Sequence, residues 1–211
     1  MATIQKHVED AFDVSSVVGT ELRIRIGPTA DEMLARFDEF VDQNRHLNLE
    51  QDCSGEIVIM PPTGAEGSSS NSEIARQLGN WAINSSGQVF DSSALFILPS
   101  GAKRSPDAAW IRSDRWQSLT KGDRKKFPHI APDFVVELRS ETDRLSTLKA
   151  KMKEYIENGV RLAWLIDPLS KKVHVYQTGE LPVILENPRS VSGGSVLAGF
   201  TLDLSRLLVK L

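Results

Sequence analysis

PDFVVELRS, residues 132 to 140, has the pattern of a buried strand: four apolar side chains within six positions, closed by Pro132 and Ser140. A short apolar run bounded by turn residues is typical of a strand covered on both faces. Residues 143 to 158 then repeat apolar side chains at helical spacing, and Gly159 stands where helices commonly end. A second apolar run, VRLAWLIDP, follows from residue 160. Strand, helix and strand in this order predict a βαβ-like crossover and an α/β fold.

The segments on either side extend the same pattern. Helices are expected over residues 30 to 43, with Thr29 and Glu32 as a capping box, and over residues 71 to 84. The runs EIVIM, QVFDS, ALFIL and DAAWI are predicted strands, the last three consecutive in one sheet, and KKVHVYQ is the expected hairpin partner of VRLAWLIDP. No repeat or linker divides the chain, so residues 1–211 are expected to form one domain.

Composition excludes several classes of protein. Hydrophobic residues make up 40% and charged residues 25% of the 211, as in globular proteins. No apolar run approaches the roughly 20 residues that span a bilayer, and the start of the sequence has no apolar signal core. A single cysteine, Cys53, agrees with a reducing compartment. We therefore expect a cytoplasmic protein without a membrane segment.

The net charge is −3, so no global basic field indicates nucleic-acid binding, and any contact with DNA must be local. The basic run KGDRKK, residues 121 to 126, is either a solvated loop or a phosphate contact. The sequence does not choose between these two interpretations. Phosphate-binding glycine loops, zinc-protease motifs and hydrolase nucleophile motifs are absent from the sequence.

Two carboxylates suggest a metal site. Glu137 lies inside the apolar run of residues 134 to 138, where an ionised group needs a partner, a proton or a cation. Asp107 follows Pro106 at the start of another predicted strand. Two carboxylates on neighbouring strands can share one Mg²⁺. The alternatives are an ion pair of Glu137 with Arg139 or Lys151, and ordinary turn chemistry for Asp107.

Other candidate residues are less well determined by the sequence. Glu73, in the first turn of the helix expected from residue 71, fits a capping box with Ser70. Lys149, Lys151 and Lys153 all lie on the helix that follows the Glu137 strand. Helical periodicity does not select one of them, and each is also a candidate for solvated surface.

SPDAAW (105 to 110), PDFVVELRS (132 to 140) and KMKEYIENGVRLAWLIDP (151 to 168), in this order and spacing, resemble the Uma-type family of putative restriction endonucleases. That family lies within the PD-(D/E)XK nuclease superfamily. The resemblance extends upstream through GEIVIMPPTG (55 to 64), NSEIARQLGNW (71 to 81) and VFDSSALFILPSGAKRSPD (89 to 107), and so covers about residues 20 to 177. It implies a restriction-endonuclease-like core with a mixed central β-sheet flanked by helices.

The resemblance also implies a site and a reaction. Asp107 and Glu137 become metal ligands, the Leu138 carbonyl a possible third, and Glu73 a helix carboxylate that reaches the metal. The usual lysine two residues after the acid is Arg139 here, which points to Lys151 instead, with Lys149 as second choice. The implied activity is Mg²⁺-dependent endonuclease cleavage of DNA, with Mn²⁺ able to substitute.

Two further expectations follow from the family. Members of the superfamily commonly pair to cut both strands, so we expect a homodimer, and Arg139 and Arg144 are candidates for phosphate contacts. The alternative function is a non-catalytic binding or assembly module that retains the nuclease fold and uses its carboxylates in buried ion pairs.

Overall fold

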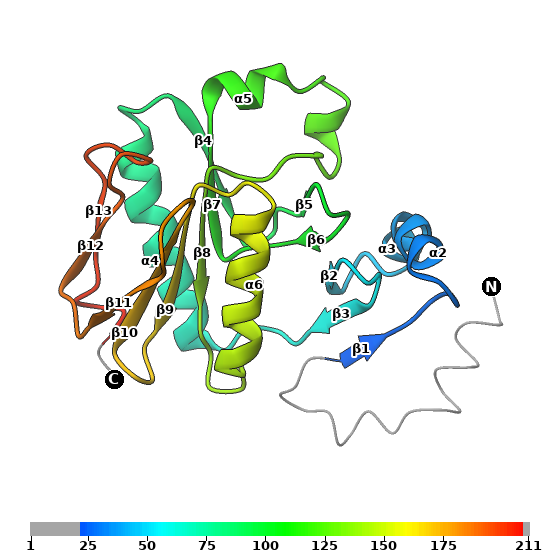
Figure 1. Ribbon diagram of the computed structural model, residues 1–211, viewed down its shortest axis with the longest axis horizontal. Helices are drawn as coiled ribbons and strands as arrows, with labels where there is room; N and C mark the ends of the chain where they lie inside the picture. The colour runs from blue at the N-terminus through cyan, green and yellow to red at the C-terminus, as the bar shows by residue number, and fades with distance from the viewer. Residues whose placement is uncertain (1–21, 209–211) are drawn as a thin grey trace.

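The computed structural model describes residues 22–208, and Figure 1 shows the arrangement of its elements. The helices are α2 (Ala30–Ala35), α3 (Phe37–Gln43), α4 (Ala65–Ala82), α5 (Ser113–Ser118), the 3-10 helix η2 (Asp123–Lys125) and α6 (Leu145–Glu157). The strands are β1 (Leu22–Ile24), β2 (Asn48–Gln51), β3 (Ile57–Met60), β4 (Gly87–Asp91), β5 (Phe96–Ile97), β6 (Lys103–Arg104), β7 (Ala108–Arg112), β8 (Phe134–Leu138), β9 (Leu162–Asp167), β10 (Lys172–Gln177), β11 (Val183–Glu186), β12 (Ser190–Ser192) and β13 (Thr201–Asp203).

A six-stranded mixed sheet forms the centre, in the order β11-β10-β9-β8-β7-β4. Its one parallel pair is β8 and β9, joined by α6, which confirms the predicted βαβ crossover. Strand β9 is buried throughout and β8 nearly so, as expected where helices or loops cover both faces of a sheet. Gly159 ends the crossover helix with a φ of +95°, a conformation that favours glycine.

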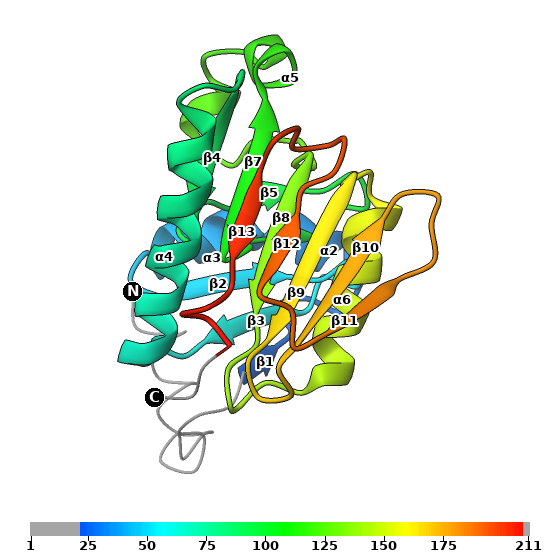
Figure 2. The same cartoon turned by 90° about the vertical axis from the view of Figure 1, so that its left-hand side faces the viewer.

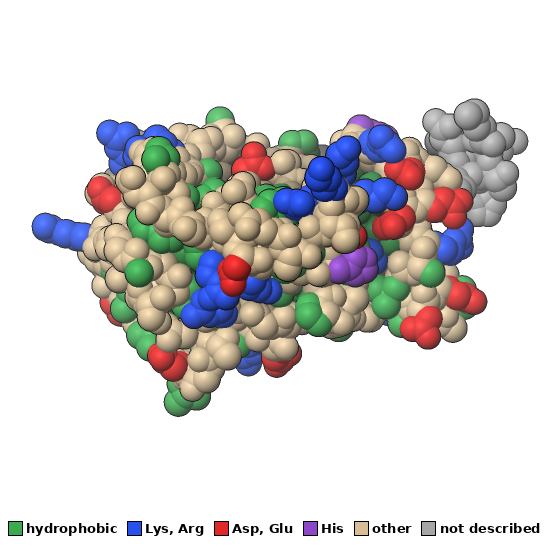
Figure 3. Space-filling model, turned by 90° about the horizontal axis from the view of Figure 1, so that it is seen from above, with side chains coloured by type: hydrophobic (Ala, Val, Ile, Leu, Met, Phe, Trp, Pro, Cys, Tyr) green, Lys and Arg blue, Asp and Glu red, His purple; other side chains and the backbone are tan. Residues whose placement is uncertain are grey.

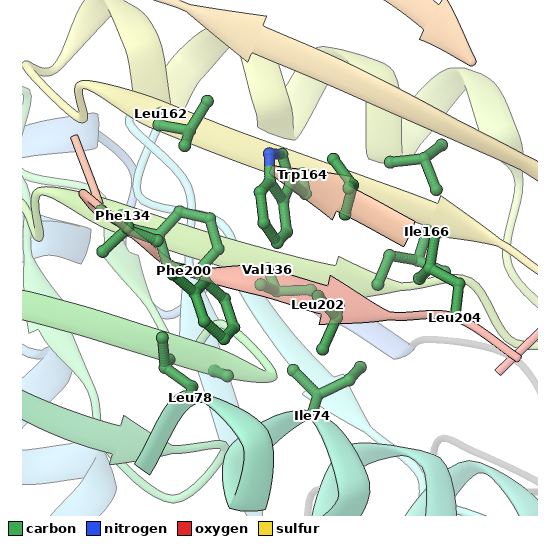
Figure 4. Packing of buried hydrophobic residues seen from close by; sticks show 14 of the residues in the cluster. Ile74, Leu78, Phe134, Val136, Leu162, Trp164, Ile166, Phe200, Leu202 and Leu204 are labelled. Atoms are coloured by element: carbon green, nitrogen blue, oxygen red, sulfur yellow. The ribbon is translucent and has the colours of Figure 1, made fainter. Parts of the chain in front are cut away.

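One face of this sheet is covered by α4 and by the C-terminal hairpin β12–β13 (Figure 2). Figure 4 shows Ile74 and Leu78 of α4 and Phe200 of the C-terminal segment packed over Phe134 and Trp164 of the sheet. The rings of Trp164 and Phe200 stack with centroids 6.0 Å apart. The C-terminal segment therefore completes the apolar core.

The opposite face is covered by α6 and by residues of a second sheet. Leu148, Met152 and Tyr155 of the helix pack there against the central strands. The second sheet has five strands in the order β1-β3-β2-β6-β5. The run ALFIL contributes β5 to this second sheet, so the expectation that it lies in one sheet with QVFDS and DAAWI is wrong. Serine, proline and glycine residues indicate where strands end, but they do not determine which sheet a short strand joins.

Two predicted helices differ in their bounds. The helix expected over residues 30 to 43 divides at Arg36 into α2 and α3, while its cap is as predicted, with the Glu32 N–H donating to the Thr29 hydroxyl at 3.3 Å. Helix α4 begins at Ala65 with Gly64 as its N-cap, so the predicted capping box of Ser70 and Glu73 is wrong.

No helix within residues 22–208 has the length and apolar character needed to cross a bilayer.

Gly87 lies where β4 approaches β7 closely. A Cβ on this residue would overlap the indole nitrogen of buried Trp110 and lie 2.7 Å from the Ile111 carbonyl oxygen. We expect Gly87→Ala to lower the free energy of unfolding by about 3 kcal/mol in denaturant titration. Gly79→Ala is the matched control, because Gly79 has open space around it and alanine favours the helix by roughly 0.5–1 kcal/mol. Equal effects of the two substitutions would contradict this packing.

Candidate active site

Two carboxylates meet where β7 begins and β8 ends. The antiparallel register pairs Ala108 with Val136, so Asp107 and Glu137, one residue further on each strand, also lie opposite each other. Asp107 is fixed by two donors: the Leu138 backbone N–H at 2.7 Å and the Asn71 side-chain amide of α4 at 2.6 Å. Burial raises the pKa of Asp107 despite these hydrogen bonds. The strand pairing thus brings together the two carboxylates that the sequence singled out.

Glu137 faces α6, where two groups contact the same carboxylate oxygen. The Lys151 ammonium lies 2.8 Å from Glu137 Oε1, and the Tyr155 hydroxyl donates to that atom at 2.9 Å. Burial raises the pKa of Glu137 to about 7, reinforced by the charge of Asp107 and only partly offset by Lys151. Of the three candidate lysines, Lys151 is the one in contact with the carboxylates. Lys153 is exposed on the helix surface.

A third carboxylate, Glu50 of β2, belongs to this group and was missed in the sequence. It is 3% exposed, and its Oε1 receives the Lys151 ammonium and the Ser105 backbone N–H, both at 2.8 Å. Burial would raise the pKa of Glu50, but the charges of Lys151 and Arg104 outweigh it and lower the pKa. A carboxylate directly after Leu49 in a short strand was the available signal, the same kind that identified Glu137.

The site carries an excess of negative charge. Arg104 lies 3.1 Å from Glu50 and 2.6 Å from Glu154 of α6. The acidic cluster, as we name it, has six members: Glu50, Arg104, Asp107, Glu137, Lys151 and Glu154. Four carboxylates therefore face two cationic side chains, which leaves two negative charges unbalanced when all four are ionised. Burial is the largest cause of the raised pKa values of Asp107 and Glu137; the charges of Asp107 and Glu50 add to it at Glu137, and the charge of Asp143 adds to it at Asp107.

Glu73 does not join the acidic cluster. Its carboxylate is held by Arg76 at 2.6 and 2.8 Å and by Gln77 at 2.9 Å, and the Arg76 hydrogen bond lowers its pKa to about 2. It lines a shallow hollow beside Asp203 and Arg206. Successive helical residues turn by 100°, so Glu73 points away from the side of α4 on which Asn71 contacts Asp107. The expected approach of Glu73 to the metal site is therefore not supported by its position.

Leu138 and Arg139 have definite places beside the site. Leu138 contributes its backbone N–H to Asp107. The Arg139 guanidinium is 3.0 Å from the buried carboxylate of Asp167 and also donates to the Asp143 carbonyl. Arg139 is therefore not the ion-pair partner of Glu137, a role that Lys151 takes.

The acidic cluster fits a hard divalent cation in donor chemistry and charge. Carboxylate oxygens are what Mg²⁺ prefers, commonly one or two with several waters. The Oδ1 atom of Asn71, beside Asp107, is buried without a hydrogen-bond partner. Within residues 22–208, no three or more Asp, Glu, His or Cys side chains are arranged to hold a metal together. The fit therefore rests on the Asp107 and Glu137 pair.

Comparison with known proteins gives a family and a fold. The model of the family described as "Uma2: Putative restriction endonuclease" matches residues 32–205. The chain is similar to the crystal structure of a putative nuclease belonging to DUF820 from Anabaena variabilis, with a TM-score of 0.65 and 19% sequence identity over 76% of this chain and 89% of that one. That likeness shows the fold, a mixed sheet with flanking helices. No curated protein matches the chain.

Proposed function

Since the chain belongs to the Uma2 family of putative restriction endonucleases, we propose that it is a DNA endonuclease that depends on a divalent metal, Mg²⁺ or Mn²⁺, bound at Asp107 and Glu137. The observation that carries the proposal is the acidic cluster: two carboxylates from adjacent strands within a buried group that has two unbalanced negative charges when its four carboxylates are ionised. A purely structural ion-pair network would be expected to balance its charges, because a buried unpaired carboxylate is costly.

The side chains of the site have distinct roles in this proposal. Asp107 and Glu137 hold the cation, and the Leu138 and Asn71 donors fix the orientation of Asp107. When bound, a divalent cation acidifies water and offsets negative charge on a phosphate undergoing attack. The charges of Glu137 and Glu50 outweigh burial and raise the pKa of Lys151, so its ammonium stays protonated at neutral pH.

A protonated Lys151 can orient an attacking water or contact the phosphate as a hydrogen-bond donor, but it cannot accept the proton of that water. Glu50 holds Lys151 in place from β2. Cleavage of both DNA strands requires two such sites, and the homodimer expected for this purpose would be tested by sedimentation of the purified protein.

The test is nicking of a supercoiled plasmid by the purified protein with Mg²⁺, with Mn²⁺ and with EDTA, alongside calorimetric titration with Mn²⁺. Asp107→Ala is expected to abolish both nicking and Mn²⁺ binding while circular dichroism shows a folded protein. Glu141→Ala, which removes an exposed carboxylate from the loop after β8, is the matched control and should retain both.

Failure of the wild-type protein to bind Mn²⁺, with or without DNA, would contradict the proposal. That result would favour the non-catalytic binding module, in which the carboxylates serve only as ion-pair partners.

A further inference from the structure

Seven cationic side chains gather at the end of the central sheet where β7 ends and β8 and β9 begin. We name this group the basic end; its members are Arg112, Arg115, Lys121, Arg124, Lys125, Lys126 and Arg161. Figure 3 looks down on this end of the molecule and shows Lys and Arg side chains gathered on it. The segment of residues 112–126 carries six cations and two carboxylates, a charge of +4 in a chain whose net charge is −3.

A buried carboxylate holds part of the basic end in place. Asp133, at the start of β8, is fully buried, and its side chain lies 3.0 Å from the Arg115 guanidinium and 3.8 Å from that of Arg161. It also accepts the Arg112 backbone N–H at 2.9 Å. Arg115 and Arg161 remain partly exposed, with side-chain exposures of 32% and 43%. Asp133 thus positions two guanidinium groups at the surface, which lowers the entropy that they lose on binding an anion.

The loop cations have no such carboxylate partner. Lys121, Lys125 and Lys126 are exposed, and the side chains of these three and of Arg124 form no ion pair within the described part of the chain. Asp123, the acidic residue among them, is hydrogen-bonded to the Thr120 hydroxyl and backbone N–H. These four cations are therefore available to neutralise a polyanion.

The segment that carries the basic loop packs on the face of the sheet that also holds α6 and the acidic cluster. Trp116 and Leu119, in the segment that carries the basic loop, pack into the same apolar cluster as Met152 and Tyr155 of α6. Asp107 and Arg112 are five residues apart along one strand, or about 17 Å at the usual rise. A DNA duplex carries one phosphate charge per roughly 1.7 Å of its length, so about ten phosphates span this distance. One duplex is long enough to reach both groups.

We propose that the basic end is the surface on which duplex DNA is held by its phosphates while another part of the same duplex reaches the acidic cluster. This inference rests on the proposed function, because it assigns the substrate of that site a second contact. It also explains how a chain with a net charge of −3 binds DNA: positive charge is concentrated at one end of the molecule rather than spread over the surface. Contacts to phosphates carry little sequence information, so the surface binds duplexes of unrelated sequence alike.

The experiment measures binding of two fluorescein-labelled 20-base-pair duplexes of unrelated sequence by anisotropy, in EDTA to prevent cleavage, over a series of salt concentrations. The test variant carries Lys121→Gln, Lys125→Gln and Lys126→Gln. The matched control carries Lys171→Gln, Arg189→Gln and Arg206→Gln, an equal change of charge at exposed cations outside the basic end that also form no ion pair within residues 22–208. We expect the test variant to bind both duplexes at least about tenfold more weakly, with the slope of log affinity against log salt reduced by about 2 to 3.

The outcomes separate this inference from the proposed function. The assignment of the basic end as a DNA-binding surface would be overturned if the test variant kept the wild-type affinity and salt slope, or if the test and control variants lost affinity equally. This holds even if the wild-type protein nicks plasmid DNA. A loss of DNA affinity in the test variant but not in the control would support this assignment even if no nicking is found. In that case only the proposed catalytic activity would fail. Absence of DNA binding by the wild-type protein would overturn the inference.

Discussion

Replacing Lys151 by methionine is expected to abolish nicking and to lower the free energy of unfolding by about 3–5 kcal/mol, the usual cost of removing one partner of a buried ion pair. The Lys151 side chain is 12% exposed, and its ammonium lies 2.8 Å from both Glu50 and Glu137. Without this ammonium group, the carboxylates of Glu50 and Glu137 lose the positive charge that both contact. Denaturant titration at pH 8 and pH 5.5 measures the effect, and the loss is expected to be larger at pH 8, where protonation relieves Glu137 less than at pH 5.5.

Two further variants separate the structural from the catalytic part of that effect. Lys153→Met removes an exposed lysine from the same helix and should change stability by no more than about 0.5 kcal/mol. Adding Glu137→Gln to Lys151→Met removes one of the uncompensated charges, so the double variant should regain much of the lost stability without regaining activity. If Lys151→Met is as stable as Lys153→Met at both pH values, the ion pairs of Lys151 do not form.

The central part of the fold was predictable because its signals are local. An apolar run, a helical stripe ended by Gly159 and a second apolar run indicated β8, α6 and β9 without any knowledge of distant contacts. The start of α4 was not predictable in this way. The small residues 65 to 70 have a weak preference for helix, and residues further along, Ile74 and Leu78, anchor the helix in the core. The predicted capping box of Ser70 and Glu73 failed for this reason, since both residues lie inside the helix.

Part of the candidate site was predictable from local signals in the sequence, and part was not. Glu137 was recognised because a charge inside an apolar strand needs a partner, and Asp107 because it begins a strand beside a proline. Helical spacing alone did not choose Lys151 over Lys149 and Lys153, because it gives the direction of a side chain but not the residue that the side chain contacts; the choice of Lys151 came from the family resemblance. Glu50 contacts Lys151 across 101 residues of sequence, and only the packing of β2 against α6 reveals that pair.

Glu137→Gln is expected to abolish Mn²⁺ binding and reduce nicking by a factor on the order of 10³, since a neutral amide is a weak ligand for a hard cation. Its effect on stability should depend on pH. In the folded protein the pKa of Glu137 is about 7, above the ordinary value of 4.5, so the folded state binds the extra proton between these values. The stability that this proton contributes is present in full below pH 4.5 and is lost as the pH rises through 7.

Glutamine cannot titrate, so the stability of Glu137→Gln relative to the wild-type protein should rise between pH 5 and pH 8, by roughly 2 to 3 kcal/mol in the metal-free proteins. Denaturant titrations in EDTA across this range measure the difference. Glu154→Gln is the matched control, because Glu154 is paired with Arg104 rather than with Lys151. A module in which Glu137 serves only as an ionised partner of Lys151 would keep its pKa at or below 4.5, so the stability of Glu137→Gln relative to the wild-type protein would stay constant between pH 5 and pH 8. A rise of this curve between pH 5 and pH 8, rather than a flat line, therefore distinguishes a site built with excess negative charge from a balanced buried ion pair.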